Sequence, residues 1–577
     1  MSSRDDKPPC GPPDFRLGDV GAFFLFVLLL LLALGTRDAA GSSPQQSSSN
    51  NRGRISGSVL NSVTHEPIAR ALVSSATQFG VMTDGEGRFQ FILPEDASSE
   101  TRYWLQVRKP GFLDDPNGRS NVEVSPGNEV AVYLVPEAII KGRIMLSTAE
   151  PASGITVQVF LKQLQSGVYR WMRQNQVRSN SNGEFRFAEL KTGTYKLLTS
   201  EFMDNDPITS IPGSQMFGFP PVYYPNATDF GTAGAIELTA GQIFEADVSL
   251  VRQPYYPVKI AVLNAEARQG LTITVTPRAN RSPGYALGYN HSRQAIEGSL
   301  PNGTYLVEGG SFGQNPAVGA VTLTVAGAPA ESGPMALGPG ASITFRVKEE
   351  FTSDESVSVF SGPIANGRHA GMAQGPRRHL SVNAEVADDF ERHQVSTLRQ
   401  LTSPNDDSMV IEGLRSGSYH LQFYPSRGYV ASATISGTDL LHQPITVAAG
   451  SNATVDVVMR DDVAELDVAV VGLGAAIAGS YAGVPGNASG NAAWIYYVPL
   501  ADSPGRFQQS NVGGDGKVSL QNMVPGTYRV MALRSRSENI PYGDAEAMRA
   551  YESKGQVVHL SPGQKTNVQL QIDSDNE

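Results

Sequence analysis

The sequence predicts an all-β protein that is built as a tandem array of about five β-sandwich modules. First, a hexapeptide that ends in Gly-Thr-Tyr or Gly-Ser-Tyr recurs about every 110 residues. Second, the 577 residues include 59 glycines and 37 prolines but only 18% charged residues, which indicates many turns between short elements. Third, the segments beside each hexapeptide alternate apolar and polar residues, as strands with one buried face do.

The repeat sets the spacing of the modules. The hexapeptides end at Tyr195, Tyr305, Tyr419 and Tyr528, at intervals of 110, 114 and 109 residues, and a looser copy places Tyr103 a further 92 residues upstream. Each tyrosine is expected to open a strand after a tight glycine turn, with its hydroxyl tying down the loop backbone as in a tyrosine corner. Stretches such as "NGEFRFAELKTGTYKLL" predict an antiparallel hairpin across the glycine turn.

The first 51 residues carry an export signal. A polar segment (1–19) with Arg4, Lys7 and Arg16 precedes an apolar segment (20–36) and a disordered linker (37–51). The apolar run suits a signal-peptide core and is short for a membrane helix, which needs ~20 residues. It is either cleaved or retained as a membrane anchor, and in both cases the rest is exported. The single cysteine, Cys10, precedes it, so no disulfide forms in the exported part.

The repeat divides the exported part into five modules. They are module one (52–136), module two (137–253), a degenerate module three (254–333), module four (334–461) and module five (462–577). In module two, an insertion (203–234) rich in proline, glycine and aromatic residues is expected not to continue a ladder. In module five, residues 538–555 predict a short helix with Asp544 as N-cap and Gly555 as its end.

Several stretches resemble a known family. In module one these are "ISGSV", "PIARALVSS", "TDGEGRFQF" and "LQVRKPGF". They are similar to the carboxypeptidase regulatory-like domain, a transthyretin-like sandwich of seven strands. "PVYYPNATD" and "GDAEAMRAYESKGQVVHLSPGQ" resemble large exported acidobacterial proteins that join such modules. The resemblance implies seven-stranded transthyretin/Ig-like sandwiches, an accessory role beside a zinc peptidase in carboxypeptidases, and a relation to a carbohydrate-binding-like fold.

No catalytic residue, metal ligand or cofactor is predicted. None of the eight histidines has the His-x-x-Glu spacing of a zinc peptidase. "GGSFG" places Ser311 in a G-x-S-x-G pattern, but a strand-like segment follows where a nucleophile elbow needs a helix. "TDGEG" offers the carboxylates of Asp84 and Glu86, yet its counterparts "NSNGEF" and "GGDGKV" change the acids. A turn with positive φ at glycine is therefore expected, not a calcium loop.

The insertion of module two carries the candidate binding residues, because sugar rings stack on aromatic side chains while amides and carboxylates bind their hydroxyls. These residues are Phe217, Phe219, Tyr223, Tyr224, Asn226 and Asp229. The alternative is that the same aromatic residues pack the loop onto its own sandwich.

The expected function is that of a non-enzymatic, exported cell-envelope protein that acts as a binding or spacer array, with carbohydrate as the first ligand class to test. The alternative is a structural or protein-docking array that assists an envelope enzyme or transporter. Polysaccharide or envelope proteins are the expected partners, with membrane contact through the N-terminal segment. The net charge of −11 gives no basic footprint for nucleic acid. The expected location is the periplasm, the outer cell surface or the membrane.

Overall fold

A computed structural model describes most of the chain from residue 54 onward. Two compact units, 1–52 and 53–577, divide the chain, and everything below concerns the second. The described residues are 54–75, 80–93, 102–116, 118–204, 215–265, 270–277, 285–311, 317–352, 379–387, 395–399, 407–472, 493–513, 515–534 and 540–572. The predicted segments 1–19, 20–36 and 37–51 lie outside these ranges. Within them, no helix has the length and apolarity to span a membrane.

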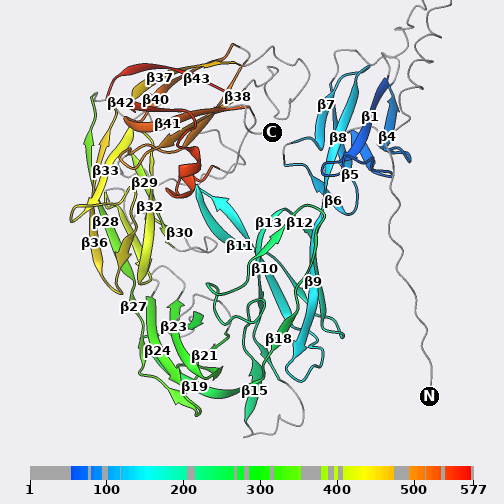
Figure 1. Ribbon diagram of the computed structural model, residues 1–577. Coiled ribbons are helices and arrows are strands. Elements are labelled where there is room, and N and C mark those ends of the chain that lie inside the picture. The colour runs from blue at the N-terminus through cyan, green and yellow to red at the C-terminus, as the bar shows by residue number, and fades with distance from the viewer. Residues whose placement is uncertain are drawn as a thin grey trace, which may run out of the picture. The chain divides into compact units, whose positions relative to one another are not determined.

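Module one sets out the two-sheet plan of the chain (Figure 1). Its first sheet has the order β4 (Arg88–Ile92), β1 (Arg54–Asn61), β8 (Glu129–Pro136) and β6 (Phe112–Asp114). Its second sheet has the order β3 (Gly80–Met82), β2 (Leu72–Ser75), β5 (Tyr103–Arg108) and β7 (Asn121–Val124). Strand β1 pairs with β4 in antiparallel and with the last strand, β8, in parallel.

Module two repeats this plan. One sheet has the order β12 (Glu184–Leu190), β9 (Ala138–Leu146) and β17 (Ile243–Glu245), with β18 (Val248–Leu250) also paired to β9. The other has the order β11 (Val168–Arg178), β10 (Thr156–Gln165), β13 (Gly193–Thr199) and β16 (Ile236–Leu238). The first strand is again parallel to the last two.

Module three extends past the expected boundary at 333. Its larger sheet has the order β14 (Phe202–Met203), β15 (Met216–Phe219), β19 (Gln253–Leu263), β22 (Ala295–Pro301) and β21 (Gly288–Asn290). Strands β25 (Ala330–Glu331) and β26 (Met335–Ala336) pair in parallel with β19. The second sheet has the order β20 (Leu271–Pro277), β23 (Gly303–Ser311), β24 (Ala317–Val325) and β27 (Gly338–Pro339).

Modules four and five have the same arrangement. In module four the first sheet has the order β31 (Val410–Leu414), β28 (Ala341–Glu350), β36 (Asn452–Arg460), β33 (Tyr429–Ile435) and β34 (Thr438–Asp439). The second sheet of module four has the order β30 (Val395–Thr397), β29 (Leu380–Val386), β32 (Gly417–Pro425) and β35 (Ile445–Val447). In module five the first sheet has the order β40 (Lys517–Met523), β37 (Ala464–Val471) and β43 (Lys565–Gln571). The second sheet of module five has the order β39 (Gln508–Val512), β38 (Ala493–Pro499), β41 (Gly526–Leu533) and β42 (Gln556–Leu560).

Each module buries its own apolar core between its two sheets. Five large clusters of buried side chains fall within 55–134, 138–250, 258–337, 341–459 and 464–570. The alternation seen in the sequence selects the buried side: in β4, Phe89 and Phe91 are buried while Arg88, Gln90 and Ile92 are exposed. The predicted fold class, an all-β tandem array of sandwiches, is confirmed.

The predicted hairpins are wrong in their pairing. Strands β12 and β13 follow one another across the Gly193 turn, but β12 pairs with β9 and β13 pairs with β10. Likewise β3 and β4, which flank "TDGEG", pair with β2 and β1 respectively. The chain therefore crosses from one sheet to the other at these turns. Alternation identifies the buried face of a strand, but it carries no information about the strand's partner.

A tyrosine corner marks one of these crossings in four modules. The hydroxyl of each repeat tyrosine donates a hydrogen bond to the carbonyl four residues upstream, as the sequence predicted. The O···O distances are 2.8 Å from Tyr195 to Lys191, 2.9 Å from Tyr305 to Pro301, 2.9 Å from Tyr419 to Arg415 and 2.6 Å from Tyr528 to Val524. All four rings are buried. The hydroxyl gives a hydrogen bond to a loop carbonyl next to the core. Without it, that carbonyl would be removed from water and left with no hydrogen-bond donor.

The glycine two residues before each tyrosine is required by the backbone. Its φ is between +153° and +158° in all four copies. Side chains also crowd the position: a Cβ at Gly303 would lie 2.9 Å from the hydroxyl of Tyr305, and one at Gly526 would lie 2.3 Å from Oγ of Ser503. Glycine is the residue that tolerates both conditions.

The helix predicted within 538–555 is shorter than expected. Among the described residues of this segment, one 3-10 helix covers Ala547–Tyr551. The N-cap is Glu546, so the prediction of Asp544 as N-cap is wrong by two residues. The carboxylate of Asp544 nevertheless accepts hydrogen bonds from the N–H groups of Glu546 and Ala547 at 3.0 and 3.1 Å. Gly555, with φ of +73°, ends the segment as β42 begins.

Removing one corner hydroxyl should destabilise one module. We expect Tyr528→Phe to lower the free energy of unfolding of module five by about 1 kcal/mol, because the carbonyl of Val524 loses its donor. Urea unfolding of the full chain should then show one transition moved to lower urea. Tyr424→Phe, at a ring that is 42% exposed, is the control. An equal effect of the two substitutions would contradict the role given to the corner.

The buried tyrosines predict a loss of stability in alkali. Burial raises the pKa of Tyr195 and of Tyr497 to about 12, above the ordinary value of 10.0. Their contribution to stability is therefore complete below about pH 10 and is lost as the pH rises towards 12. Far-ultraviolet circular dichroism of urea unfolding across this range should show the decline, and Tyr497→Phe should make it shallower. If Tyr497→Phe removed phenol absorbance that titrates near pH 10, and not near pH 12, the prediction would be contradicted.

Candidate functional site

Residues 203–204 and 215–234 of the aromatic insertion are described, and the second of these stretches forms a strand near its start. Residues Met216–Phe219 form β15, which pairs with β19 in a register that sets Met216 opposite Tyr255 and Gly218 opposite Gln253. The expectation that the insertion cannot continue a ladder is wrong here. Two of the prolines, at 220 and 221, follow the strand directly instead of interrupting it, so the N–H groups of the strand are available for pairing.

Two of the six candidate residues lie on this strand. The ring of Phe217 is half-buried, and the guanidinium carbon of Arg252 lies 3.9 Å from its centroid. Phe219 is buried and stacks on Phe202, with 6.4 Å between the ring centroids. Both rings are therefore engaged in packing beside β19.

The other four candidates lie farther along the insertion. Tyr223 is buried, with its ring edge-on to Phe230 at 5.5 Å, and Tyr224 packs edge-on against Phe244 at 6.0 Å. The side-chain carbonyl of Asn226 accepts a hydrogen bond from the N–H of Ser249 at 3.3 Å. The carboxylate of Asp229 accepts from the N–H and the hydroxyl of Thr232 at 2.9 and 2.7 Å.

The six residues are thus not brought together on one exposed surface. The aromatic residues pack the loop onto sheets of modules two and three. This is close to the alternative given in the sequence analysis, in which the aromatic residues pack the loop onto its own sandwich. Asn226 and Asp229 fasten the loop backbone, and the hydrogen bonds from Thr232, above all that of its hydroxyl, lower the pKa of Asp229.

A cluster that we call the aromatic face lies where the loop covers β10, β11 and β13. It consists of Phe160, Trp171, Lys196, Tyr223 and Phe230. Trp171 is edge-on to Phe230 at 5.2 Å, and Lys196 stands opposite Phe160 in the ladder between β13 and β10. Aromatic edges and faces in contact at these distances attract through their quadrupoles in addition to the area they bury.

Lys196 joins the loop to the sheet electrostatically. Its Nζ donates a hydrogen bond to the carbonyl of Phe230 at 2.6 Å and lies 5.1 and 4.3 Å from the ring centroids of Trp171 and Phe230. The residue is only 8% exposed. Burial lowers the pKa of Lys196, and the nearby carboxylate of Asp229 opposes this effect. The faces of the Trp171 and Phe230 rings attract the ammonium group of Lys196, because an aromatic face carries partial negative charge.

Tyr169 forms the exposed rim of the aromatic face. It is 38% exposed, and Nζ of Lys162, on the neighbouring strand, lies 5.2 Å from its ring centroid. Tyr169, Trp171 and Lys196 were not among the residues expected from the sequence. The stretch "VYRWM" contained the signal, because aromatic residues two apart on a strand share one face.

The acidic turns bind their own backbone. Oδ1 of Asp84 accepts hydrogen bonds from the N–H groups of Glu86 and Arg88 at 3.1 and 2.7 Å. Oδ1 of Asn180 does the same for Asn182 and Glu184, both at 2.9 Å. The following glycines, Gly87, Gly183 and Gly516, have φ of +70°, +73° and +70°. The predicted positive φ is confirmed, and the first acid or amide serves as an acceptor in an Asx turn.

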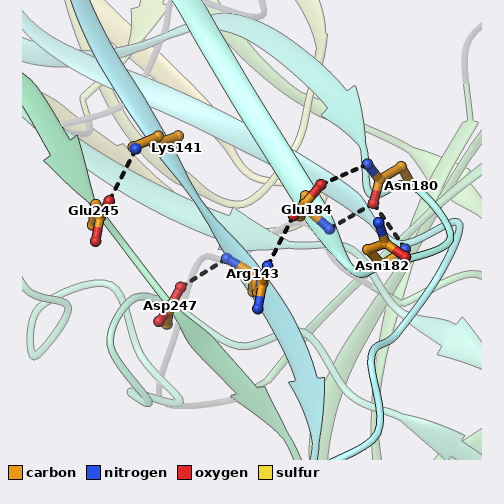
Figure 2. A network of polar contacts seen from close by, with 7 residues as sticks. All are labelled: Lys141, Arg143, Asn180, Asn182, Glu184, Glu245 and Asp247. Carbon is orange, nitrogen blue, oxygen red and sulfur yellow. Dashed lines mark hydrogen bonds and ion pairs between the residues drawn. The ribbon is translucent and has the colours of Figure 1, made fainter.

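A polar network ties the second of these turns to the first strand of module two. Figure 2 shows Glu184 between Asn180 and Arg143, with Glu245 at the end of β17 and Asp247 in the short connection from β17 to β18. Arg143 Nη2 lies 3.0 Å from Glu184, the N–H of Arg143 donates to Asp247 at 2.8 Å, and Lys141 Nζ lies 2.9 Å from Glu245. Hydrogen bonds from Asn180 and then Arg143 lower the pKa of Glu184. Most of these side chains are exposed, so the network positions the turn more than it stabilises the module.

The patterns tested for catalysis have structural roles. Ser311 is the last residue of β23, and its Oγ accepts a hydrogen bond from the N–H of Ala317 at 2.8 Å. The next described element is strand β24, where a nucleophile elbow would continue into a helix. Across the described ranges, no group of three or more histidine, cysteine, aspartate or glutamate side chains is arranged to hold a metal ion.

Comparisons with known proteins give matches among solved structures alone. No family model matches the chain, and no curated protein does. The minor pilin GBS52 of Streptococcus agalactiae is 13% identical, with 35% of this chain and 96% of that chain covered, at a TM-score of 0.18. The Bacillus anthracis TIE protein is 10% identical, with 74% and 69% covered, at 0.14. A mutant form of the shaft pilin SpaA of Lactobacillus rhamnosus GG is 11% identical, with 35% and 98% covered, at 0.19. The chain is a multi-domain β-sandwich protein on the evidence of its own sheets.

The first Asx turn predicts a difference between two substitutions. We expect Asp84→Ala to destabilise module one by ~0.5–1 kcal/mol, because two N–H groups lose their acceptor. Asp84→Asn should preserve stability, since asparagine takes the same place at Asn180, and Glu86→Ala is the control. Thermal unfolding with and without Ca²⁺ is the measurement. A melting temperature that rises with Ca²⁺ in the native chain but not in Asp84→Asn would contradict the turn interpretation.

Proposed function

We propose that the chain is a non-enzymatic, exported spacer whose modules carry tension at the cell envelope. The observation that supports this proposal is the parallel pairing of the first and last strands in every module. The ladder joins six residue pairs between β1 and β8, nine between β28 and β36, and seven between β37 and β43. In modules two and three, two short last strands continue one another along β9 and β19.

Parallel terminal strands determine how a module responds to a pull. The chain enters at the start of the first strand and leaves at the end of the last, so the two attachment points lie at opposite ends of one ladder. Tension slides the strands along each other and loads all the ladder hydrogen bonds together. An antiparallel terminal pair would instead open one bond at a time. Resistance to force is governed by the barrier to unfolding, which the shared load raises.

Short connections pass the load from module to module. One residue separates β8 from β9, two separate β18 from β19, one separates β27 from β28 and three separate β36 from β37. Connections this short can extend very little, so tension on one module reaches the terminal strands of the next almost at once.

Ion pairs lie across the same ladders in four modules. The shortest N···O distances are 2.9 Å for Lys141 and Glu245, 3.7 Å for Lys259 and Glu331, 2.7 Å for Arg346 and Asp456, and 3.1 Å for Lys565 and Glu465. Exposed pairs contribute little to stability. Their repeated position favours a role in keeping the register of the two terminal strands.

The resemblance to the carboxypeptidase regulatory-like family and the N-terminal segment support the proposed location outside the cytoplasm. The proposed partners are envelope proteins or polysaccharide, with membrane contact through residues 20–36. No sequence motif or described side-chain cluster supports catalysis, and the net charge of −11 gives no basic footprint for nucleic acid.

Single-molecule stretching tests the tension-bearing role. With Cys10→Ser and handles at the two chain ends, we expect five discrete unfolding steps that each release about 80–120 residues, or roughly 25–40 nm. Handles at Ser381→Cys and Tyr424→Cys, which stand opposite in an antiparallel ladder, should unfold module four at a several-fold lower force. Gradual lengthening without steps, or equal forces in the two geometries, would refute the proposal.

A second proposal is that the rim of the aromatic face binds carbohydrate. The supporting observation is the exposed ring of Tyr169, which has the amine of Lys162 beside it and Trp171 two residues further along the strand. The amine lies over one face of the ring. An exposed ring close to a polar group suits a sugar, whose C–H faces stack and whose hydroxyls need partners.

The glycan proposal predicts a specific loss of retention. On a panel of immobilised polysaccharides, Tyr169→Ala in the full chain should bind about five- to tenfold more weakly, since one aromatic contact contributes on the order of 1 kcal/mol. Tyr424→Ala removes an equally exposed tyrosine from module four and is the control. Substitution of the buried Tyr223 would confuse folding with binding. Absence of retention on every glycan would end this proposal and leave the spacer role untouched.

A further inference from the structure

One hairpin of module two extends beyond its own sheet. Strand β11 is the edge strand of that sheet and, among the described strands, pairs with β10 alone. Strand β10 pairs with β13 over residues 157–161, whereas its pairing with β11 continues as far as Gln165 and Val168. The end of the hairpin is therefore a ribbon of two strands, which we call the arm (162–171).

Ser166 and Gly167 form the turn of the arm. Their φ angles are +50° and +79°, both positive as in a type I′ hairpin turn. A ribbon of two strands that stands alone is open to water on both faces. In this structure Gly167 is buried and Arg170 is only 6% exposed. The end of the arm is therefore covered by another part of the chain.

Module five contacts the turn of the arm. The N–H of Gly543 donates a hydrogen bond to the carbonyl oxygen of Gly167 at 2.9 Å. Modules three and four lie between these two residues in the sequence. The contact therefore differs from one between neighbouring modules, such as that of Nε2 of His442 with the carbonyl oxygen of Ser503 at 3.0 Å. It joins the two ends of a segment of four modules.

The segment of module five that meets the arm is anchored to its own sheet. Ile540 is buried, and Tyr542 stacks on Phe507 with 4.2 Å between the ring centroids and 6° between the ring planes. All three side chains belong to the same apolar cluster as Tyr496 of β38 and Met531 of β41. The surface that receives the arm is thus formed by packing within module five.

Two glycines allow the backbones to meet. A Cβ at Gly167 would lie 2.6 Å from the nitrogen of Gly543, and a Cβ at Gly543 would lie 2.7 Å from Cγ2 of Val168. The turn of the arm needs glycine at 167 because of its positive φ. The φ of Gly543 lies outside the left-handed region, so its own backbone does not require glycine. The missing side chain at 543 therefore serves the contact with module two.

We propose that the arm is a latch that holds modules two and five together in the relaxed chain. Because modules three and four also connect these two modules, the latch carries part of any load applied along that segment. A contact centred on one pair of glycines yields at a lower force than a terminal ladder of six to nine residue pairs that are loaded together. The latch is therefore the first element to open, and the array lengthens before any module unfolds.

The covalent connection between the modules keeps so small a contact closed when there is no load. Modules two and five belong to one chain, so their docking is not opposed by the entropy of bringing two molecules together. The docking rests on the contacts described above, whereas its release under load rests on the spacer proposal.

Distances between spin labels test the docking in the full chain. With Cys10→Ser, labels at Arg173→Cys in β11 and Arg549→Cys in the 3-10 helix occupy exposed positions on the two sides. Pulsed electron paramagnetic resonance should give a single narrow distribution of distances. Gly543→Leu should replace it with a broad distribution, because the added side chain takes the place of Val168.

A second variant excludes damage to module five as the cause. Val168→Lys changes the arm instead and should broaden the distribution to the same extent. Gly85→Leu is the control, since a Cβ there meets nothing within 4 Å, and it should leave the distribution narrow. A narrow distribution that survives either Gly543→Leu or Val168→Lys would overturn the proposal, and so would a broad distribution in the labelled chain without these substitutions.

Stretching from the two chain ends separates the latch from the spacer role. We expect one lengthening step at a several-fold lower force than the module steps, and we expect Gly543→Leu to abolish that step alone. If the module steps appear without the early one, the latch is refuted and the spacer role stands. If the early step appears but module four unfolds at equal force in the two pulling geometries, the spacer role is refuted and the latch stands.

Discussion

The hydrogen bond from a buried tyrosine hydroxyl to the carbonyl four residues upstream is the interaction on which the repeated architecture depends. In four modules it stands where the chain leaves the sheet of the first strand and enters the opposite one. The turn needs a glycine with a φ that other residues avoid, and it exposes a carbonyl to the core. The hydroxyl satisfies that carbonyl without admitting water, so the two sheets can close over an apolar interior.

Crossing between sheets also explains why the terminal strands of each module meet. Because the chain moves from sheet to sheet at its turns, the last strand returns to the sheet that holds the first and pairs with it in parallel. Successive modules are then joined end to end by one to three residues. The proposed tension-bearing role rests on this connectivity. Contacts between neighbouring modules, such as that of His442 with Ser503, join them in addition to the connecting residues.

The candidate site illustrates how the same residue types serve packing or binding according to their surroundings. The insertion of module two was selected for its aromatic residues, yet Phe219 and Tyr223 are buried. Their burial covers a sheet face that would otherwise be exposed, and Lys196 holds the covering loop through the carbonyl of Phe230. The ring left at the surface, Tyr169, comes from a neighbouring hairpin that composition alone did not single out. Exposure is a property of the assembled module and cannot be read from a list of aromatic residues.

The sequence by itself determined the all-β class, the period of the modules, the buried side of each strand and the roles of the repeat tyrosines and glycines. These features depend on local alternation and on backbone conformations that neighbouring residues decide. The tertiary structure alone decided which strands pair, since the turns at Gly193 and Gly87 cross between sheets where a hairpin was expected. It also decided which aromatic rings remain exposed and that the arm of module two meets Gly543 of module five. Partners distant in sequence are selected by the packing of whole sheets, which no local pattern records.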